Sequence, residues 1–181
     1  MDDIFSKITA LILAVILLYI FPVESMLTRQ DEITKVFVLN ETAKFVDSAR
    51  NLGYITPLMY TQFLRVLSST GNEYEILMEH RHISIDPIYI DPVDKTSFQY
   101  DFNINENAYY TEEILACLFP PAAAPDQDRY YYMSKGDYFS VHVYNKNKTA
   151  AAKVQQMLIM AELPVKRIVV NYGGMVRDEA D

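Results

Sequence analysis

The start of the chain is dominated by one run of apolar residues. Residues 8–23 (ITALILAVILLYIFPV) are sixteen uncharged positions bounded by Lys7 and Glu24. As a helix, this run is about 24 Å long, slightly less than the ~30 Å hydrocarbon core of a bilayer. Extension to residues 4–27 closes the gap if Lys7 and Glu24 reach toward the headgroups. The pattern therefore predicts a transmembrane helix within residues 1–27.

Two other interpretations of this run remain open. A cleaved signal peptide has an apolar region of similar length, and Val23-Glu24-Ser25 is a tolerable cleavage site. Such signals usually start more positive than this chain, in which Asp2 and Asp3 accompany Lys7, and the helical pattern continues past Ser25. A core helix without a polar face would need complete burial, as in a fibre. We expect the anchoring side chains to be Leu11, Leu13, Val15, Ile16, Leu17 and Leu18.

Residues 28–52 are predicted to continue the helix as an amphipathic stalk, with one polar face exposed to solvent. Opposite charges follow at helical spacing, as in Asp31 and Lys35. Pro22 is expected to kink the helix near the junction of its two halves, and Gly53 to end it. The narrow apolar stripe predicted to pack on the rest of the protein contains Val38, Phe45, Ala49 and Leu52.

Residues 53–176 predict a small head, and residues 177–181 an acidic, frayed tail. The fold class is α+β, with the long N-terminal helix packed on a small antiparallel or mixed sheet with short helices. A right-handed parallel crossover near the end of the head is left open. The predicted helices cover residues 57–69, capped by Thr56, residues 112–119, capped by Thr111, and a segment that ends at Met160, capped by Asn147. The predicted strands cover residues 73–83, 137–144 and 165–172, the last of which is followed by Gly173-Gly174. Residues 84–107 are predicted as loops with one edge strand near 98–102.

Composition excludes several functional classes. Sixteen Lys and Arg against 24 Asp and Glu give a net charge of −8, which leaves no electrostatic footprint for nucleic acid. The one cysteine, Cys117, lies among apolar and acidic neighbours, which favours a buried structural thiol over a reactive one. The chain contains no glycine-rich phosphate loop and no GxSxG, HExxH or kinase signature, so no enzymatic activity and no cofactor is predicted.

Three histidines offer the main chemical alternative. His80 and His82 lie two apart in a predicted strand and so share a face, and His142 lies in another strand. Three imidazoles on neighbouring strands could form an open metal site that activates water. The simpler interpretation is that they belong to the solvated side of a sheet. Asp86, Asp91 and Asp94 lack the spacing of an EF-hand loop and are more typical of turns.

The chain contains fourteen tyrosines, a number that favours a protein–protein interface on the head. Tyrosine provides a large contact area at low entropy cost and is enriched where proteins meet. The densest run is Tyr130, Tyr131 and Tyr132, which we take as a candidate interface. Ordinary packing of half of these rings into the sheet is the alternative.

A short acidic start, an apolar helix and an amphipathic continuation ending in FVDSARNLGYIT (residues 45–56) together resemble the pilin-like proteins of tight-adherence pilus loci in Gram-positive bacteria. Residues 57–71 (PLMYTQFLRVLSSTG) followed by NEYEI resemble the passage from helix to strand in the same proteins. The similarity covers residues 1–81.

The resemblance implies a non-enzymatic, single-pass protein of the plasma membrane with its head outside the cell, acting as a minor pilin or assembly component of a type IV-like pilus. Its partners would be the lipid bilayer and other pilin-like subunits or assembly proteins, in a homo- or hetero-assembly through the N-terminal helix. The chain has no Gly-Phe-x-x-x-Glu processing motif, and Glu24 lies at the far end of the apolar run. Fibre subunit and anchored accessory therefore both remain open, as does a secreted, signal-cleaved binding module or metal-dependent hydrolase using His80, His82 and His142.

Overall fold

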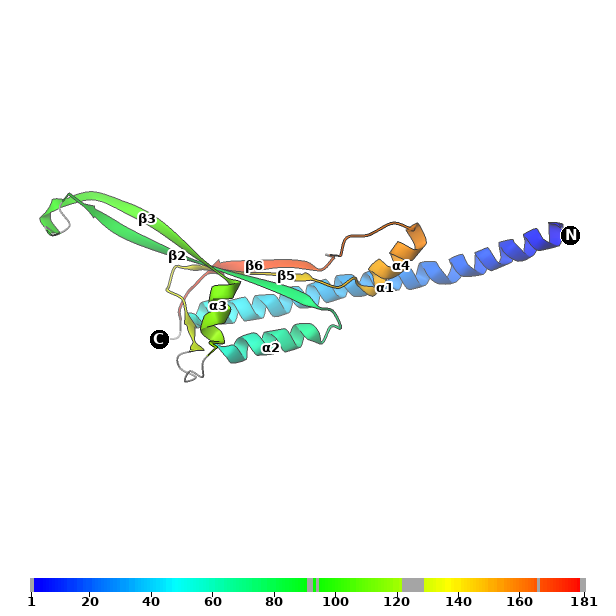
Figure 1. Ribbon diagram of the computed structural model, residues 1–181, viewed down its shortest axis with the longest axis horizontal. Helices are drawn as coiled ribbons and strands as arrows, with labels where there is room; N and C mark the ends of the chain where they lie inside the picture. The colour runs from blue at the N-terminus through cyan, green and yellow to red at the C-terminus, as the bar shows by residue number, and fades with distance from the viewer. Residues whose placement is uncertain (1, 91–92, 94, 122–128, 166, 180–181) are drawn as a thin grey trace.

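The computed structural model describes residues 2–90, 93, 95–121, 129–165 and 167–179. It confirms the α+β class, with one long helix packed along an antiparallel sheet (Figure 1). In chain order the elements are α1 (Asp2–Leu52), β1 (Tyr54–Ile55), α2 (Pro57–Ser68), β2 (Tyr74–Tyr89), the 3₁₀ helix η1 (Lys95–Ser97), β3 (Phe98–Tyr110), α3 (Thr111–Leu118), β4 (Tyr131–Tyr132), β5 (Tyr138–Asn145), α4 (Ala150–Ile159) and β6 (Val169–Met175).

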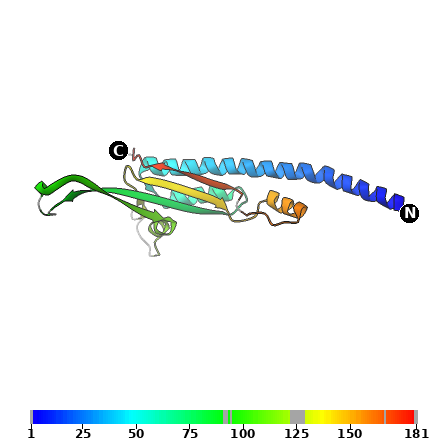
Figure 2. The same ribbon diagram turned by 90° about the horizontal axis from the view of Figure 1, so that it is seen from above.

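The helix α1 is one unbroken element of 51 residues. At about 1.5 Å per residue it is roughly 75 Å long, so it extends far beyond the head. Pro22 lies inside it, and Figure 2 shows a gradual curve in place of the predicted sharp kink. Gly53 ends it as predicted: its φ is +73°, and its amide donates to the Ala49 carbonyl at 3.0 Å.

The residues after β6 dock on the end of α1 instead of fraying. The amides of Arg177 and Asp178 both donate to the Arg50 carbonyl, and the amide of Glu179 donates to the Asn51 carbonyl at 2.7 Å. The last carbonyls of a helix have no partners within the helix, so these amides satisfy groups that would otherwise need water. The prediction of a frayed tail is therefore wrong for residues 177–179, and residues 180–181 lie outside the described residues.

The main sheet has the order β3-β2-β5-β6, and every neighbouring pair is antiparallel. This rules out the parallel crossover, because β5 and β6 pair antiparallel with Val143 opposite Val170. A second, two-stranded sheet joins β1 to β4. The helices α1 and α2 cover one face of the main sheet (Figures 1 and 2).

The region predicted as loops is instead a long hairpin that projects from the head, away from the N-terminus (Figure 1). β2 continues to Tyr89 and pairs with β3 from Glu79 onward. Beyond Arg81, where pairing with β5 ends, β2 has only β3 beside it among the described strands, so Pro87 interrupts no second ladder. The prediction failed because Asp86-Pro87, Asp91-Pro92 and polar spacers between isolated aromatics are typical of loops.

The core lies between the sheet and the two helices. Phe45 is stacked on Phe63 of α2 with ring centroids 4.6 Å apart, and its edge contacts Phe139 of β5. Along α1, Val38, Phe45 and Ala49 are buried, whereas Leu52 is half-buried. The stalk therefore forms one side of the head's hydrophobic core.

Several predicted element ends shift by a few residues. Thr56 caps α2 as predicted, since its Oγ1 accepts from the Met59 amide at 3.2 Å. Thr149, not Asn147, caps α4, and Thr111 is the first residue of α3, where its Oγ1 accepts from the Met78 amide. Gly173 and Gly174 lie inside β6 and do not end it. Gly173 is required there because an added Cβ would lie 2.9 Å from both the Phe139 carbonyl oxygen and the Ser140 Cα.

Candidate functional site

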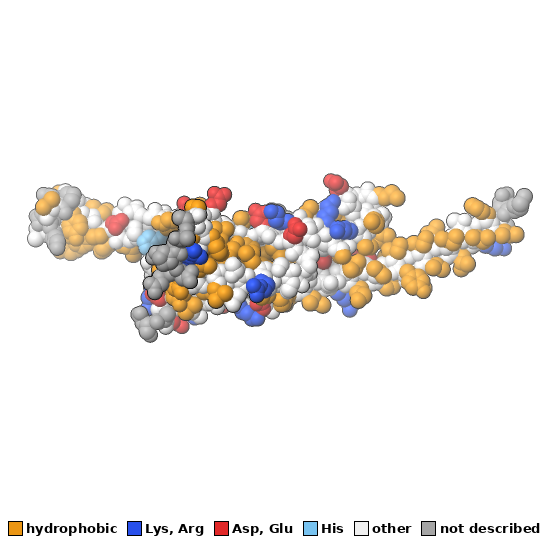
Figure 3. Space-filling view, turned by 60° about the horizontal axis from the view of Figure 1, so that its bottom comes forward, with side chains coloured by type: hydrophobic (Ala, Val, Ile, Leu, Met, Phe, Trp, Pro, Cys, Tyr) orange, Lys and Arg blue, Asp and Glu red, His pale blue; other side chains and the backbone are white. Residues whose placement is uncertain are grey.

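The apolar half of α1 is the most distinctive surface of the protein. α1 is the one described helix that is long and apolar enough to cross a membrane, and none of the residues in its most apolar stretch is buried. Figure 3 shows hydrophobic side chains along the helix beyond the head. A core helix of a soluble protein would be mostly buried, whereas contacts within this chain leave the apolar run uncovered. The predicted anchoring residues have exposed fractions of 66% (Leu11), 53% (Leu13), 48% (Val15), 46% (Ile16), 46% (Leu17) and 73% (Leu18).

A polar junction marks the point where the apolar half of α1 meets the head. Thr149 Oγ1 donates to Asp31 Oδ2 at 2.6 Å, and Arg167 Nη1 lies 3.7 Å from the same oxygen. Gln155 of α4 donates from its Nε2 to Glu24 Oε1 and accepts from Arg167 Nη2. These contacts fix α4 alongside α1. The two helices run in opposite directions, because the start of α4 contacts Asp31 and its later residue Gln155 contacts Glu24.

The histidine pair forms a cluster with an acidic residue that the sequence did not single out, and in this cluster His80 and Asp137 are buried and His82 is partly exposed. His80 Nε2 lies 2.8 Å from Asp137 Oδ2, and His82 Nδ1 lies 2.8 Å from Asp137 Oδ1. The second ring nitrogen of His80 lies 2.7 Å from the Tyr131 hydroxyl. Alternation along β2 places both histidines on one face, and Asp137 directly precedes β5, whose Phe139 pairs with His80.

The Asp137 carboxylate is held ionised by this cluster. Burial raises the pKa of Asp137, but hydrogen bonds from His80, from the Ser134 amide at 2.7 Å and from His82 outweigh burial, so the net pKa is lowered. Burial also raises the pKa of the Tyr131 hydroxyl, so it stays protonated. The cluster thus joins β2, β4 and the turn before β5 through one buried charge.

The structure does not bring the three histidines together. Leu77 pairs with His142 across the sheet, whereas His80 pairs with Phe139, and positions 77 and 80 point to opposite faces. His142 therefore faces away from His80 and His82. Among the described residues, no group of three or more His, Cys, Asp or Glu side chains is arranged to hold a metal ion.

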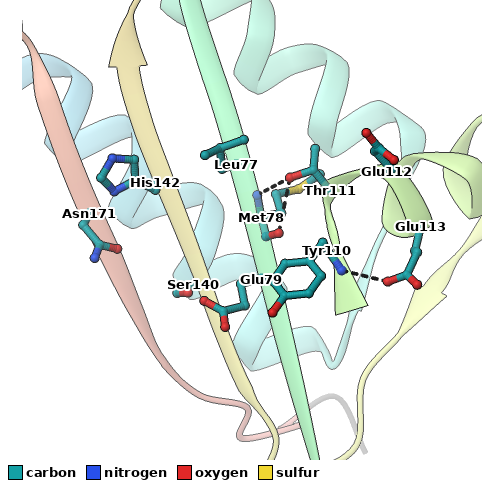
Figure 4. A pocket seen from close by; sticks show the side chains of 10 residues that line it. All are labelled: Leu77, Met78, Glu79, Tyr110, Thr111, Glu112, Glu113, Ser140, His142 and Asn171. Atoms are coloured by element: carbon teal, nitrogen blue, oxygen red, sulfur yellow. Dashed lines mark hydrogen bonds between the residues drawn. The ribbon is translucent and has the colours of Figure 1, made fainter. Parts of the chain in front are cut away.

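A cleft of about 550 Å³ lies on the open face of the sheet, where β3 gives way to α3. Figure 4 shows His142 and Asn171 on one side of it and Glu112 and Glu113 on the other. Glu113 Oε2 accepts from the Tyr110 amide at 2.9 Å as part of the α3 cap, and Glu79 Oε1 accepts from Arg81 Nε at 2.8 Å. Glu113 and Glu79 thus each have a hydrogen-bond partner on a neighbouring residue.

The candidate tyrosine interface divides between core and surface. Tyr131 points inward to His80, while Tyr132 is 66% exposed. Tyr130 stacks on Tyr54 with ring centroids 5.4 Å apart, and Tyr132 meets the same ring edge-on. The run therefore builds an aromatic cluster around the small β1–β4 sheet, of which mainly Tyr132 remains available to a partner.

Cys117 and the aspartates of the hairpin have local roles. Cys117 is half-buried, and its Sγ lies 3.7 Å from the Tyr130 carbonyl. Asp86 Oδ2 accepts from Asn105 Nδ2 at 2.8 Å across the hairpin. Asp91 and Asp94 lie outside the described residues.

Comparison of the chain with protein-family models, curated proteins and solved structures gives no match.

Proposed function

We propose that this chain is a non-enzymatic, single-pass, membrane-anchored pilin-like protein. It would act as a minor pilin or assembly component of a type IV-like, tight-adherence pilus. The apolar half of α1 is the anchor, and the head lies on the outer side of the plasma membrane.

The contrast between the two halves of α1 carries this proposal. From Val38 onward the helix buries one face in the head, but Leu11 to Leu18 are exposed although they are almost all large aliphatic residues. Burying each such side chain contributes about 1.5–3 kcal/mol. Six of them in water would impose a large free-energy cost, which removal into lipid or into a helix bundle relieves.

The same surface serves an assembly. A helix that is apolar all round can exchange lipid neighbours for helices of other subunits without meeting water, because both surroundings are apolar. A subunit stored in the membrane could thereby enter a fibre or a complex through α1 while its head remains folded.

Substitution inside the apolar run tests the anchor. The double variant Val15→Asp/Leu17→Asp should move the protein from the membrane pellet to the soluble fraction, because an Asp near the bilayer centre costs about 2.5–3.5 kcal/mol. The matched control is Ile33→Asp/Val36→Asp, which places two acids at exposed apolar positions of the stalk (70% and 57%) and should leave the protein in the pellet. Retention of Val15→Asp/Leu17→Asp by salt-washed membranes would overturn the proposal.

Two measurements on the native protein decide between anchor and secretion. An intact mass that includes the residues before Ser25 supports the anchor, whereas their loss supports a cleaved signal peptide. Protease added to intact cells should digest the head if it lies outside. Protection of the head until the cells are lysed would contradict the proposed orientation.

A further inference from the structure

The last turn of α4 exposes large apolar side chains that the head does not cover. Ala151 and Ala152, at its beginning, are fully buried, but Met157 and Met160, at its end, are 78% and 94% exposed. Leu158 and Ile159 between them are also exposed. Four consecutive apolar side chains thus face outward on all sides of the helix end.

This apolar end lies beside the apolar half of α1. Thr149 bonds Asp31 and Gln155 bonds Glu24, so α4 runs toward the N-terminus of α1. Five more residues at about 1.5 Å each carry its end to about the level of Ile20. In both ribbon views this end is the part of the head nearest the N-terminus (Figures 1 and 2). Ile20 is half-buried, whereas residues 4–19 are exposed.

The charges around α4 also differ from those of the whole chain. Residues 146–160 contain three lysines and no acidic residue, although the chain has a net charge of −8. Lys153 is exposed on α4 itself. An apolar helix end that follows an exposed lysine suits the headgroup region of a membrane, where anionic lipids attract the lysine, whereas Lys146 and Lys148 are bonded to Glu75 and Gln156.

We infer that residues 157–160 form a second membrane contact that inserts into the headgroup region of the bilayer crossed by α1. The inference rests on the proposed anchor, because α1 sets the height of α4 relative to the lipid. With two contacts, the head cannot rotate or tilt freely about α1. The polar junction at Glu24 and Asp31 then lies just outside the lipid, where water and headgroups surround its charges.

Single-tryptophan variants test this contact, because the chain has no tryptophan of its own. Full-length Met157→Trp and Met160→Trp would be placed in lipid nanodiscs that each hold one copy. Leu18→Trp reports on the anchor, and Tyr100→Trp, at a 90% exposed site on the hairpin, is the control away from lipid. Quenching is measured with lipids brominated near the headgroup and, separately, deep in the acyl chain.

Each outcome is distinguishable. Quenching of Trp at 157 and 160 by the shallow bromine, several-fold above that of Trp at 100, supports the inference. Quenching at position 18 without quenching at 157 and 160 overturns it and leaves the anchor standing, and shielding of those two sites from an aqueous quencher would then assign them to a protein contact. Absence of quenching at all four positions would refute the proposed anchor itself.

Discussion

His80 and Asp137 form a buried hydrogen bond between β2 and the turn that precedes β5. The two atoms, His80 Nε2 and Asp137 Oδ2, are 2.8 Å apart, and the residues are 4% and 2% exposed. Because the pKa of Asp137 is lowered, its carboxylate is ionised and can only accept, so the His80 nitrogen that faces it carries the proton. The bond fixes the base of the projecting hairpin to the head.

Asp137→Asn should therefore destabilise the head by about 1–3 kcal/mol, the usual cost of leaving buried donors without their acceptor. An Asn nitrogen in the place of Oδ2 would face both the His80 imidazole N–H and the Ser134 amide, which are donors themselves. Urea unfolding of the full chain in detergent, followed by circular dichroism, measures the change. Asp86→Asn, at an exposed hydrogen bond on the hairpin, is the control and should have little effect.

The same pair predicts a pH dependence. A carboxyl whose pKa is lower in the folded than in the unfolded state stabilises the fold above its unfolded pKa, about 3.9, and loses that contribution as pH falls through the folded pKa. The stability gap between the native protein and Asp137→Asn should thus shrink as pH falls below about 4. A gap that widens below about pH 4 would refute this assignment.

A second prediction concerns the contact between stalk and head. Phe45→Ala should cost about 3–5 kcal/mol, because Phe45 is 6% exposed and stacked on Phe63. Phe37→Ala changes the same residue type on the same helix, but at a 37% exposed position, and should cost under about 1 kcal/mol. Comparable losses for both variants in urea unfolding would mean that α1 packs on the head through a different face.

Much of the fold follows from local patterns along the chain. The long helix is read from an apolar run joined to an amphipathic one, and its end from Gly53. Thr56 and Pro57 identify the start of α2 because a side-chain cap and a residue without an amide proton suit the first turn. The strand β5 shows clear alternation with Phe139, Val141 and Val143 buried.

The hairpin was missed although a signal was present. Ile83, Ile85 and Pro87 alternate with polar residues on β2, and Ile104 and Phe102 of β3 lie opposite Ile85 and Pro87. The alternation was obscured by Asp-Pro and Asn, which are typical of turns. Among the described residues, no hydrophobic core covers this ribbon, so its two strands are stabilised mainly by antiparallel backbone pairing and little by burial.

The histidine cluster shows what sequence cannot supply. Spacing alone places His80 and His82 on one face, but their partner Asp137 is 55 residues further along the chain. Only the register between β2 and β5 determines that Asp137 lies beside them and that His142 faces the other way. Long-range register is set by the whole core, and no local pattern encodes it.

A third prediction concerns the stability of the hairpin. In hydrogen exchange of the full chain in detergent, the amides of residues 83–89 should exchange faster than those of residues 76–80 in the same strand. The inner residues are paired on the β5 side and packed over the core, whereas the outer ones have β3 alone and an exposed surface. Equal protection along β2 would mean that a partner, such as another copy, covers the ribbon.

The last prediction concerns the seat of α4 on α1. Thr149 Oγ1 accepts from the Ala152 amide at 3.2 Å and donates to Asp31 Oδ2 at 2.6 Å, so one hydroxyl both starts α4 and ties it to the stalk. Thr149→Ala removes both bonds and should weaken α4 by about 1–2 kcal/mol. Faster exchange of the α4 amides, with β5 unchanged, is the expected result.

Thr61→Ala is the matched control for this variant, because the Thr61 hydroxyl bonds only carbonyls of its own helix, Pro57 and Leu58, at an exposed site. Asp31→Asn separates the two roles of Thr149, since it leaves the cap in place and removes only the charge that accepts from Thr149 and faces Arg167. If Asp31→Asn loosens α4 as much as Thr149→Ala does, the tie to the stalk dominates. Unchanged α4 exchange in both variants would show that the bond between Thr149 and Asp31 has no part in holding α4 against the stalk.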